Sequence, residues 1–373
     1  MKYNIKKLAF DFPITRIKFS PDDKILAIAC QDMIYIWDME KQGYKHLFRC
    51  SSNVSSIEFS KDIKLLASGS IDGKIYIWEL ATDTLQKVLN LCQGGIWEIC
   101  FSPDGKKIIY SDAEIDENNA KIASCENNIW IWDLMQNKCI KKFTKHHNGE
   151  SIRRIAFFSE RNIVAVAYGS LRYKSIVLWN INTEERLFTL QHQPDYTWVQ
   201  GISFNGEGTK LAAGYSYGGH GGIRIWDISD TPGNEKCLAF FDEEESIVQI
   251  SFSKNGLYIA STGGYHYNYI QVWDAIQKKC IAKIHGRKYG TALLVDINSI
   301  GDKMASVGYE FKRPLLYACY KILILLFPSI RWFINVIKEI VYFRREFRIK
   351  DFKESEIQFK THCVLKICFL KNR

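Results

Sequence analysis

The chain has 373 residues, of which 47% are hydrophobic and 14% aromatic, enough apolar side chain for a large core, so a disordered protein is excluded. Residues 311–373 hold 14 Lys and Arg against 5 Asp and Glu, which accounts for the whole net charge of +9. Residues 1–310 are neutral, and their charge therefore gives no reason to expect a nucleic-acid partner.

The cysteines indicate a reducing compartment. There are 11 of them, scattered along the chain without a C-x-x-C pair or the spacing of a zinc site. Such a set is typical of buried free thiols in a cytosolic or nuclear protein. The first residues, MKYNIKKLAFDF, contain no apolar run of signal-peptide type. We expect a cytoplasmic or nuclear protein that is not secreted.

A short phrase ending in Trp and an acidic or amide residue recurs along the chain. It reads IYIWD, IYIWE, IWIWD, IVLWN, IRIWD and IQVWD, with its tryptophan at Trp37, Trp78, Trp132, Trp179, Trp226 and Trp273. Successive tryptophans are 41, 54, 47, 47 and 47 residues apart. A repeat of about 40–45 residues is the length of one four-stranded propeller blade.

Two further pieces precede each phrase. The first is an apolar strand that ends in a polar turn, such as IWEICFSPDG from Ile96, in which a bulge near the start would turn Ile96, Ile99 and Phe101 toward the core. The second is a short strand of small residues, such as LLASGS at Leu65–Ser70. Each repeat therefore predicts three strands in a fixed order.

With these pieces in register, residues 1–310 resemble the WD-repeat family. The resemblance implies an all-β, seven-bladed WD-repeat β-propeller over residues 1–320, in which an N-terminal velcro strand, Tyr3–Phe10, completes the last blade and removes exposed sheet edges. The degenerate blade seven begins with Ala292–Gly308, and Pro314–Tyr320 lies at the right distance to be its third strand. Residues of the repeat with a structural role are Trp37, Asp38, Ser68, Asp72, Trp78, Trp132, Asp133, Trp179, Trp226, Asp227, Trp273 and Asp274.

Residues 321–373 form a short basic and aromatic C-terminal tail for which three interpretations stay open. Ile330, Phe333, Ile337 and Ile340 recur at helical spacing, so part of the tail could be a docking helix. The basic balance and Trp332 also fit a membrane-surface anchor. The third interpretation is a degenerate end of the gene without a function.

Signs of catalysis or of metal binding are missing from the sequence. Blades of this family often carry a hydrogen-bonded set of Asp, His, Ser or Thr, and Trp, which satisfies a buried indole N–H. The second repeat has Ser68, Asp72 and Trp78, but Cys50 precedes them in place of a His. No nucleophile elbow, zinc-protease motif or kinase signature occurs. We therefore expect no catalytic residue, cofactor or metal site, and a protein that is not an enzyme.

Partners of this family usually lie across the narrow face, where the innermost strands begin. The residue after the first apolar position of each repeat is Thr15, Ser55, Trp97, Arg153, Gln200, Val248 and Leu293. Because Trp and Arg dominate interface energetics, a partner-binding patch is expected around a few of these positions and their neighbours. Its residues are Trp97, Arg153, Trp198, Gln200, Tyr265 and His266.

The expected function is a non-enzymatic protein–protein interaction scaffold or adaptor within a multiprotein complex. Its partners would be proteins or peptide motifs, with no nucleic acid and no homo-oligomer required. The alternative is a peripheral membrane-associated propeller recruited through the basic aromatic tail. A propeller enzyme is the third class, and it would need a cluster of catalytic groups near the channel that the sequence does not show.

Overall fold

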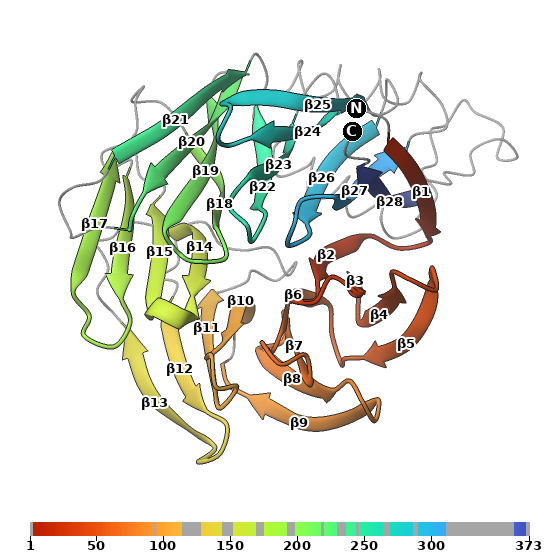
Figure 1. The fold of residues 1–373 in the computed structure, drawn as a ribbon. Coiled ribbons are helices and arrows are strands. Elements are labelled where there is room, and N and C mark those ends of the chain that lie inside the picture. The colour runs from red at the N-terminus through yellow and green to blue at the C-terminus, as the bar shows by residue number, and fades with distance from the viewer. Residues whose placement is uncertain are drawn as a thin grey trace, which may run out of the picture.

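The structure is a computed structural model that consists of four-stranded antiparallel sheets arranged as a ring (Figure 1). It describes residues 3–92, 94–113, 128–143, 152–168, 175–191, 198–217, 220–229, 236–243, 246–263, 269–285, 290–310 and 362–370. The helical part of these ranges is one 3-10 turn, η1 (Ser159–Arg161). Among the residues that the structure describes, no helix has the length and the apolar composition needed to cross a membrane.

Six blades are each built from four consecutive strands. Blade one is β2 (Ile14–Phe19), β3 (Ile25–Cys30), β4 (Met33–Asp38) and β5 (Gly43–Arg49); blade two is β6 (Val54–Phe59), β7 (Leu65–Ser70), β8 (Lys74–Glu79) and β9 (Thr84–Asn90). Blade three is β10 (Gly95–Phe101), β11 (Lys107–Ala113), β12 (Ile129–Asp133) and β13 (Lys138–Phe143). Blade four is β14 (Ile152–Phe158), β15 (Ile163–Tyr168), β16 (Ser175–Asn180) and β17 (Arg186–Gln191). Blade five is β18 (Trp198–Phe204), β19 (Lys210–Tyr217), β20 (His220–Asp227) and β21 (Lys236–Glu243); blade six is β22 (Ile247–Phe252), β23 (Tyr258–Gly263), β24 (Tyr269–Asp274) and β25 (Lys279–His285).

The ring is closed by a composite sheet that corrects the predicted seven-bladed fold. Six blades, not seven, are formed from consecutive strands, and the remaining sheet combines β26 (Gly290–Ile297) and β27 (Lys303–Glu310) with β28 (His362–Leu370) and β1 (Tyr3–Phe10). Strand β28 lies between β27 and β1 and is antiparallel to both (Figure 1). The third strand of this sheet is therefore β28 and not Pro314–Tyr320, which lies outside the described residues.

The correction has a sequence cause. Strand β28 reads HCVLKICFL, an apolar run without the Trp-Asp phrase that marks the third strand of the six blades. Lys366 interrupts the apolar residues of this strand, and nothing in it marks the repeat. The expected helix of the tail has no counterpart in the described part of residues 321–373, which is this strand; its proposed apolar positions, Ile330 to Ile340, lie outside the described residues.

The innermost strands hold the ring together. Strands β2, β6, β10, β14, β18, β22 and β26 each contact the next, and β26 contacts β2 again. At this last junction the Phe19 N–H donates to Asp296 Oδ2 at 2.8 Å, and the Ser299 N–H donates to Asp23 Oδ1 at 3.0 Å. The ring is thus closed by inner contacts between the composite sheet and blade one as well as by the pairing of β1 with β28.

Lysines of the outer strands join neighbouring sheets at the rim. Lys6 Nζ donates to the Gln42 carbonyl at 3.0 Å, and Lys87 Nζ donates to the Leu134 carbonyl at 2.7 Å. Lys141 makes the same kind of contact with Asn182, at 2.6 Å. Each lysine projects from an outer edge strand and donates to a backbone carbonyl in the turn between the third and fourth strands of the next blade. These cations protect the sheet edges and also connect neighbouring blades.

The tryptophans of the repeat are packed between blades. Trp37, Trp78, Trp226 and Trp273 are each at most 5% exposed, and the outer strand of all six blades has a bulge opposite the tryptophan. The Trp78 Nε1–H donates to Ser68 Oγ at 3.0 Å, and the Trp273 Nε1–H donates to Ser261 Oγ at 2.9 Å. These bonds satisfy two buried indoles within the second and third strands of their own blades.

In five of the six blades, the Asp or Asn that follows the tryptophan shapes the next turn. Asp38 Oδ1 accepts hydrogen bonds from the backbone N–H groups of Glu40 and Lys41, and Asp274 Oδ1 accepts them from Ile276 and Gln277. Asp133, Asn180 and Asp227 cap the corresponding turns. An Asx turn of this kind needs a short side chain with an oxygen acceptor, which explains the Trp-Asp and Trp-Asn pairs.

Removing the acceptor of a buried indole is expected to destabilise blade two. In Ser68→Ala the Trp78 N–H keeps its burial but loses its partner, so the free energy of unfolding should fall by about 1–3 kcal/mol. Urea unfolding in a double-mutant cycle with Trp78→Phe measures this term. Because the indole N–H is absent in the Phe background, Ser68→Ala should cost much less there; equal costs in both backgrounds would show that the bond is unimportant.

Candidate functional site

The seven innermost strands share a β-bulge close to their first residue. In every sheet one residue of the inner strand is left without a cross-strand partner. These bulged residues are Thr15, Ser55, Trp97, Arg153, Gln200, Val248 and Leu293, the same seven positions that the repeat pattern singled out. A bulge re-aims its side chain and often lies beside a functional surface. We call the face on which these strands begin the bulge face, and the opposite one, which carries the Asx turns, the turn face.

Two small bulged residues serve the ring itself. Thr15 Oγ1 donates to the Val54 carbonyl at 2.6 Å and so ties blade one to blade two. Ser55 Oγ donates to the Ile96 carbonyl and ties blade two to blade three. Their hydroxyls lie against the neighbouring inner strand, so the bulge at these two positions supports the ring.

The larger predicted residues lie on blades three to five. Trp97, Arg153 and Gln200 occupy the bulges of the consecutive inner strands β10, β14 and β18. Trp198 begins β18 and is 36% exposed, and the Gln200 carbonyl accepts a hydrogen bond from Arg154 Nε at 2.6 Å. The backbone of Arg153 is placed in β14, whereas its side chain, and Tyr265 and His266 as a whole, lie outside the described residues.

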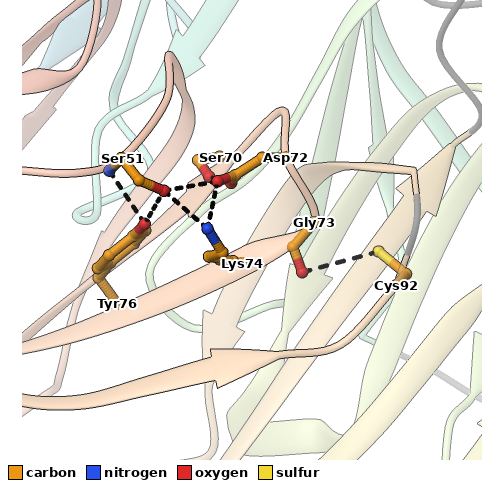
Figure 2. Close-up of polar contacts among 7 residues, drawn as sticks. All are labelled: Ser51, Ser70, Asp72, Gly73, Lys74, Tyr76 and Cys92. Carbon is orange, nitrogen blue, oxygen red and sulfur yellow. Dashed lines mark hydrogen bonds and ion pairs between the residues drawn. The ribbon is translucent and has the colours of Figure 1, made fainter.

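A polar cluster on blade two was not predicted as a unit (Figure 2). Ser51 Oγ donates to Asp72 Oδ2 at 2.6 Å and accepts from Lys74 Nζ at 2.9 Å, while Lys74 pairs with Asp72 at 2.9 Å. The Tyr76 hydroxyl lies 2.6 Å from Ser51 Oγ and accepts from the Ser51 N–H at 3.0 Å. Ser70 Oγ donates to the other Asp72 oxygen. The only sequence signal was Asp72, which the repeat places in the turn after β7.

The charges of this cluster argue against catalysis. A serine hydroxyl between a lysine and a tyrosine can act as a nucleophile if the lysine is neutral. Here the hydrogen bond from Lys74 to Asp72 raises the pKa of Lys74. Burial works to raise the pKa of Asp72, but hydrogen bonds from Ser51, Ser70 and Lys74 hold it below its usual value. Both groups stay charged at neutral pH, so Lys74 is no general base and the cluster fixes the loop at Ser51.

The polar set expected in blade two is divided into two parts. Cys50 Sγ lies 3.5 Å from Ser68 Oγ, which accepts the Trp78 N–H, and burial raises the pKa of Cys50 to about 11. Asp72 bonds instead to Ser51 and Ser70 near the surface. Without the expected histidine, the buried Cys50–Ser68–Trp78 chain and the surface cluster around Asp72 are separate. Blade four has Val166 at the position of Ser68, which offers no acceptor.

Gly73 fixes the turn beside this cluster. Its φ is +79°, and a Cβ at this position would lie 2.0 Å from the Cys92 carbonyl oxygen. Cys92 Sγ in turn lies 3.9 Å from the Gly73 carbonyl oxygen (Figure 2). Only glycine combines a positive φ with so close an approach of a neighbouring backbone, so this residue holds the turn of blade two against the loop that leads to blade three.

Charged side chains line the central channel on the inner strands. Lys18 pairs with Glu58 at 3.0 Å, and Asp296 Oδ1 accepts from Ser251 Oγ at 2.7 Å while Oδ2 accepts from the Phe19 N–H. The attraction of Glu58 raises the pKa of Lys18 and outweighs burial, which lowers it. Burial raises the pKa of Asp296 above 3.8. This level of the channel links blade six, the composite sheet and blades one and two.

Nearer the bulge face, an ion pair reaches across the channel. Arg16 follows the bulge of β2 and Glu98 follows the bulge of β10, and their charged groups lie 3.7 Å apart although β6 lies between these strands. Arg154, which follows the bulge of β14, also attracts the Glu98 carboxylate. Burial nevertheless raises the pKa of Glu98. Across the described ranges, His, Cys, Asp and Glu side chains form no group of three that could hold a metal ion.

A ring of four-stranded sheets around a channel defines the class of β-propellers, and comparison with known proteins gives the family. Residues 5–38 and 43–79 match the model of the WD domain, G-beta repeat. This match confirms the resemblance to the WD-repeat family that the repeats predicted. Solved propellers superpose on it: the RRP9 WD40 repeats with a TM-score of 0.63 and 18% identity, covering 81% of this chain and 89% of that one, and U3-55K with 0.62, 17%, 81% and 90%.

The matches to curated proteins cover a smaller share of this chain than the solved structures do. Autophagy-related protein 16 of Arabidopsis thaliana is 24% identical over 56% of this chain and 36% of its own length. Transducin beta-like protein 3 of Mus musculus is 29% identical over 58% and 26%. Target of rapamycin complex subunit wat1 of Schizosaccharomyces pombe is 27% identical over 35% and 38%. The chain thus spans about a quarter to two fifths of these relatives.

Proposed function

We propose that this protein is a non-enzymatic interaction scaffold that binds protein partners on its bulge face. The observation that carries the proposal is the set of seven bulges, one per sheet, which brings Trp97, Arg153 and Gln200 onto consecutive inner strands with Trp198 beside them. An aromatic side chain that is 36% exposed on such a face is the residue type that interfaces favour.

The similar proteins support the same class of function. One of them is named as a subunit of a complex, the target of rapamycin complex. The propeller here is a rigid ring with two faces, an architecture suited to holding several partners at once. We infer that proteins are the partners of this chain as well, and that its place in the cytoplasm or nucleus follows from the complex it joins.

Replacing Trp198 tests the proposal. Affinity purification of the full chain with quantitative mass spectrometry should recover a set of stable partners, and Trp198→Ala should lower their yield at least tenfold, because truncating an interface tryptophan often costs 2 kcal/mol or more, on the order of a thirtyfold change in affinity. Unchanged near-UV circular dichroism would confirm that the ring is intact.

A matched control lies on the turn face. Met135 is 80% exposed in the turn after β12, so Met135→Ala removes a comparable apolar side chain from the opposite face. It should leave partner recovery unchanged. Equal recovery with the wild type and Trp198→Ala would exclude Trp198 from the interface, and loss with Met135→Ala alone would move the interface to the turn face.

A further inference from the structure

Two lysines occupy equivalent positions in turns on the turn face of the ring. Lys61 follows Ser60 in the turn between β6 and β7 of blade two, and Lys254 follows Ser253 in the turn between β22 and β23 of blade six. In both turns the serine hydroxyl donates at 2.7 Å to the side-chain oxygen of the residue two positions further on. The lysines therefore leave the same kind of turn, and any difference between their amines comes from the groups around them.

The amine of Lys61 is paired, whereas the amine of Lys254 has no ion-pair partner among the described residues. Lys61 Nζ lies 3.4 Å from Glu160 Oε1, in an ion pair between blades two and four. Lys254 Nζ instead donates to the Pro21 carbonyl of blade one at 3.4 Å. This is a long hydrogen bond, and it uses one of the three N–H groups of the ammonium. The charge of Lys254 is therefore held less firmly than that of its counterpart.

The surroundings of Lys254 favour the uncharged amine. Neighbouring sheets fix the turn, because the Gly206 N–H donates to the Lys254 carbonyl at 2.9 Å and the Asn255 N–H donates to the Ser299 carbonyl at 3.0 Å. From this fixed point the side chain extends from blade six, past the composite sheet, to blade one. Partial burial of the amine and then the like charge of Lys18 lower the pKa of Lys254, against the attraction of nearby carboxylates. A larger fraction of this amine is thus neutral and nucleophilic near neutral pH.

We propose that the ε-amine of Lys254 is an acylation site, to which an acyl thioester transfers a small acyl group. The neutral amine attacks the carbonyl carbon of the thioester, so that a C–N bond forms and the C–S bond breaks. The thiolate leaves with the electron pair of that bond and takes up the proton that the amine loses. Lys254 is exposed, so a thioester reaches it from the turn face. The product amide keeps one N–H for the Pro21 carbonyl and removes a positive charge beside Lys18, so the modification is compatible with the fold.

The site goes beyond the proposed function because it lies on the opposite face of the ring. Acylation replaces a cation by a neutral and more apolar group at the turn-face end of the channel, whereas partners are proposed to bind the bulge face. The outcome of the Trp198→Ala experiment therefore has no bearing on Lys254, and failure of either proposal leaves the other standing.

Acetylation of the folded full chain by acetyl-CoA, followed by peptide mass spectrometry over time, tests the site. At about pH 8, Lys254 should be acetylated about threefold faster than Lys61, its matched control in the equivalent turn. In urea the two rates should be nearly equal, because unfolding removes the difference in surroundings. The rate at Lys254 should also level off at a lower pH in the folded chain than in urea, since its pKa is lowered by the fold.

Two substitutions separate the effect of the surroundings from that of exposure alone. Lys18→Met removes the like charge and should slow acetylation of Lys254 about threefold. Lys64→Met removes an exposed cation from the turn face of blade two and should leave the rate at Lys254 unchanged. Equal rates at Lys254 and Lys61 in the folded wild type, an unchanged or faster Lys254 in Lys18→Met, or equal slowing by Lys64→Met would overturn the proposal. If Lys18→Met failed to fold, a pH profile of Lys254 that is the same in the folded chain and in urea would overturn it.

Discussion

Replacing Asp296 by alanine is expected to destabilise the protein by about 3 kcal/mol, because it leaves the Phe19 N–H and the Ser251 hydroxyl without their acceptor and removes a counter-charge of Lys18. The residue links blade six, the composite sheet and blade one at the point where the ring closes. Urea unfolding at neutral pH measures the change. Asp296→Asn keeps one carbonyl acceptor and the shape of the side chain, so it should cost clearly less.

The pH dependence of the same variants has a definite sign. Burial raises the pKa of Asp296 above 3.8, so the folded protein binds this proton more tightly than the unfolded chain does. The stability that this group contributes is present below about pH 4 and is lost as the pH rises through the folded pKa. Asp296→Asn lacks this titration. The advantage of the wild type over Asp296→Asn should therefore shrink as the pH rises above 4, and an advantage that grows would contradict the structure.

Gly73→Ala is the second change with a large expected effect. A side chain at a φ of +79° is strained by about 1–2 kcal/mol, and its Cβ would meet the Cys92 carbonyl oxygen at 2.0 Å, so the turn or the loop must move. We expect a total loss of about 3 kcal/mol or more in the free energy of unfolding, measured by urea denaturation.

Gly105 offers a matched control for this prediction. Its φ is +67°, in the same region as that of Gly73, but a Cβ there meets nothing within 4 Å. Gly105→Ala should therefore cost only the backbone strain of about 1–2 kcal/mol. If the two variants lost equal stability, the close contact between Gly73 and the Cys92 loop would have no energetic role.

Periodicity explains how much of the fold could be predicted from the sequence. The six Trp phrases predicted the third strands of the blades, and the apolar pattern predicted inner strands such as β10, with a bulge near its start that the structure places at Trp97. Strand β28 was missed because it carries no repeat phrase and because 51 residues, 311–361, separate it from β27, although Glu310 and His362 are paired. Pairing over such a distance depends on the three-dimensional ring and leaves no local signal.

The candidate site was predictable in position and not in chemistry. The pattern treated Thr15 and Ser55 like Trp97, yet their hydroxyls bind neighbouring strands, which only the structure could show. The cluster of Ser51, Lys74 and Tyr76 joins a loop to a strand, so it depends on packing that no spacing rule records. The counter-ion role of Glu98 likewise depends on a contact across the channel.

Hydrogen–deuterium exchange on the purified complex tests the central claim most directly, namely that the bulge face binds the partner. We predict that the partner slows exchange in the first residues of β10, β14 and β18, and leaves the turns after Asp38, Asp133 and Asp274 unchanged. Protection of those turns, with no change at the starts of the inner strands, would place the partner on the turn face and contradict the account.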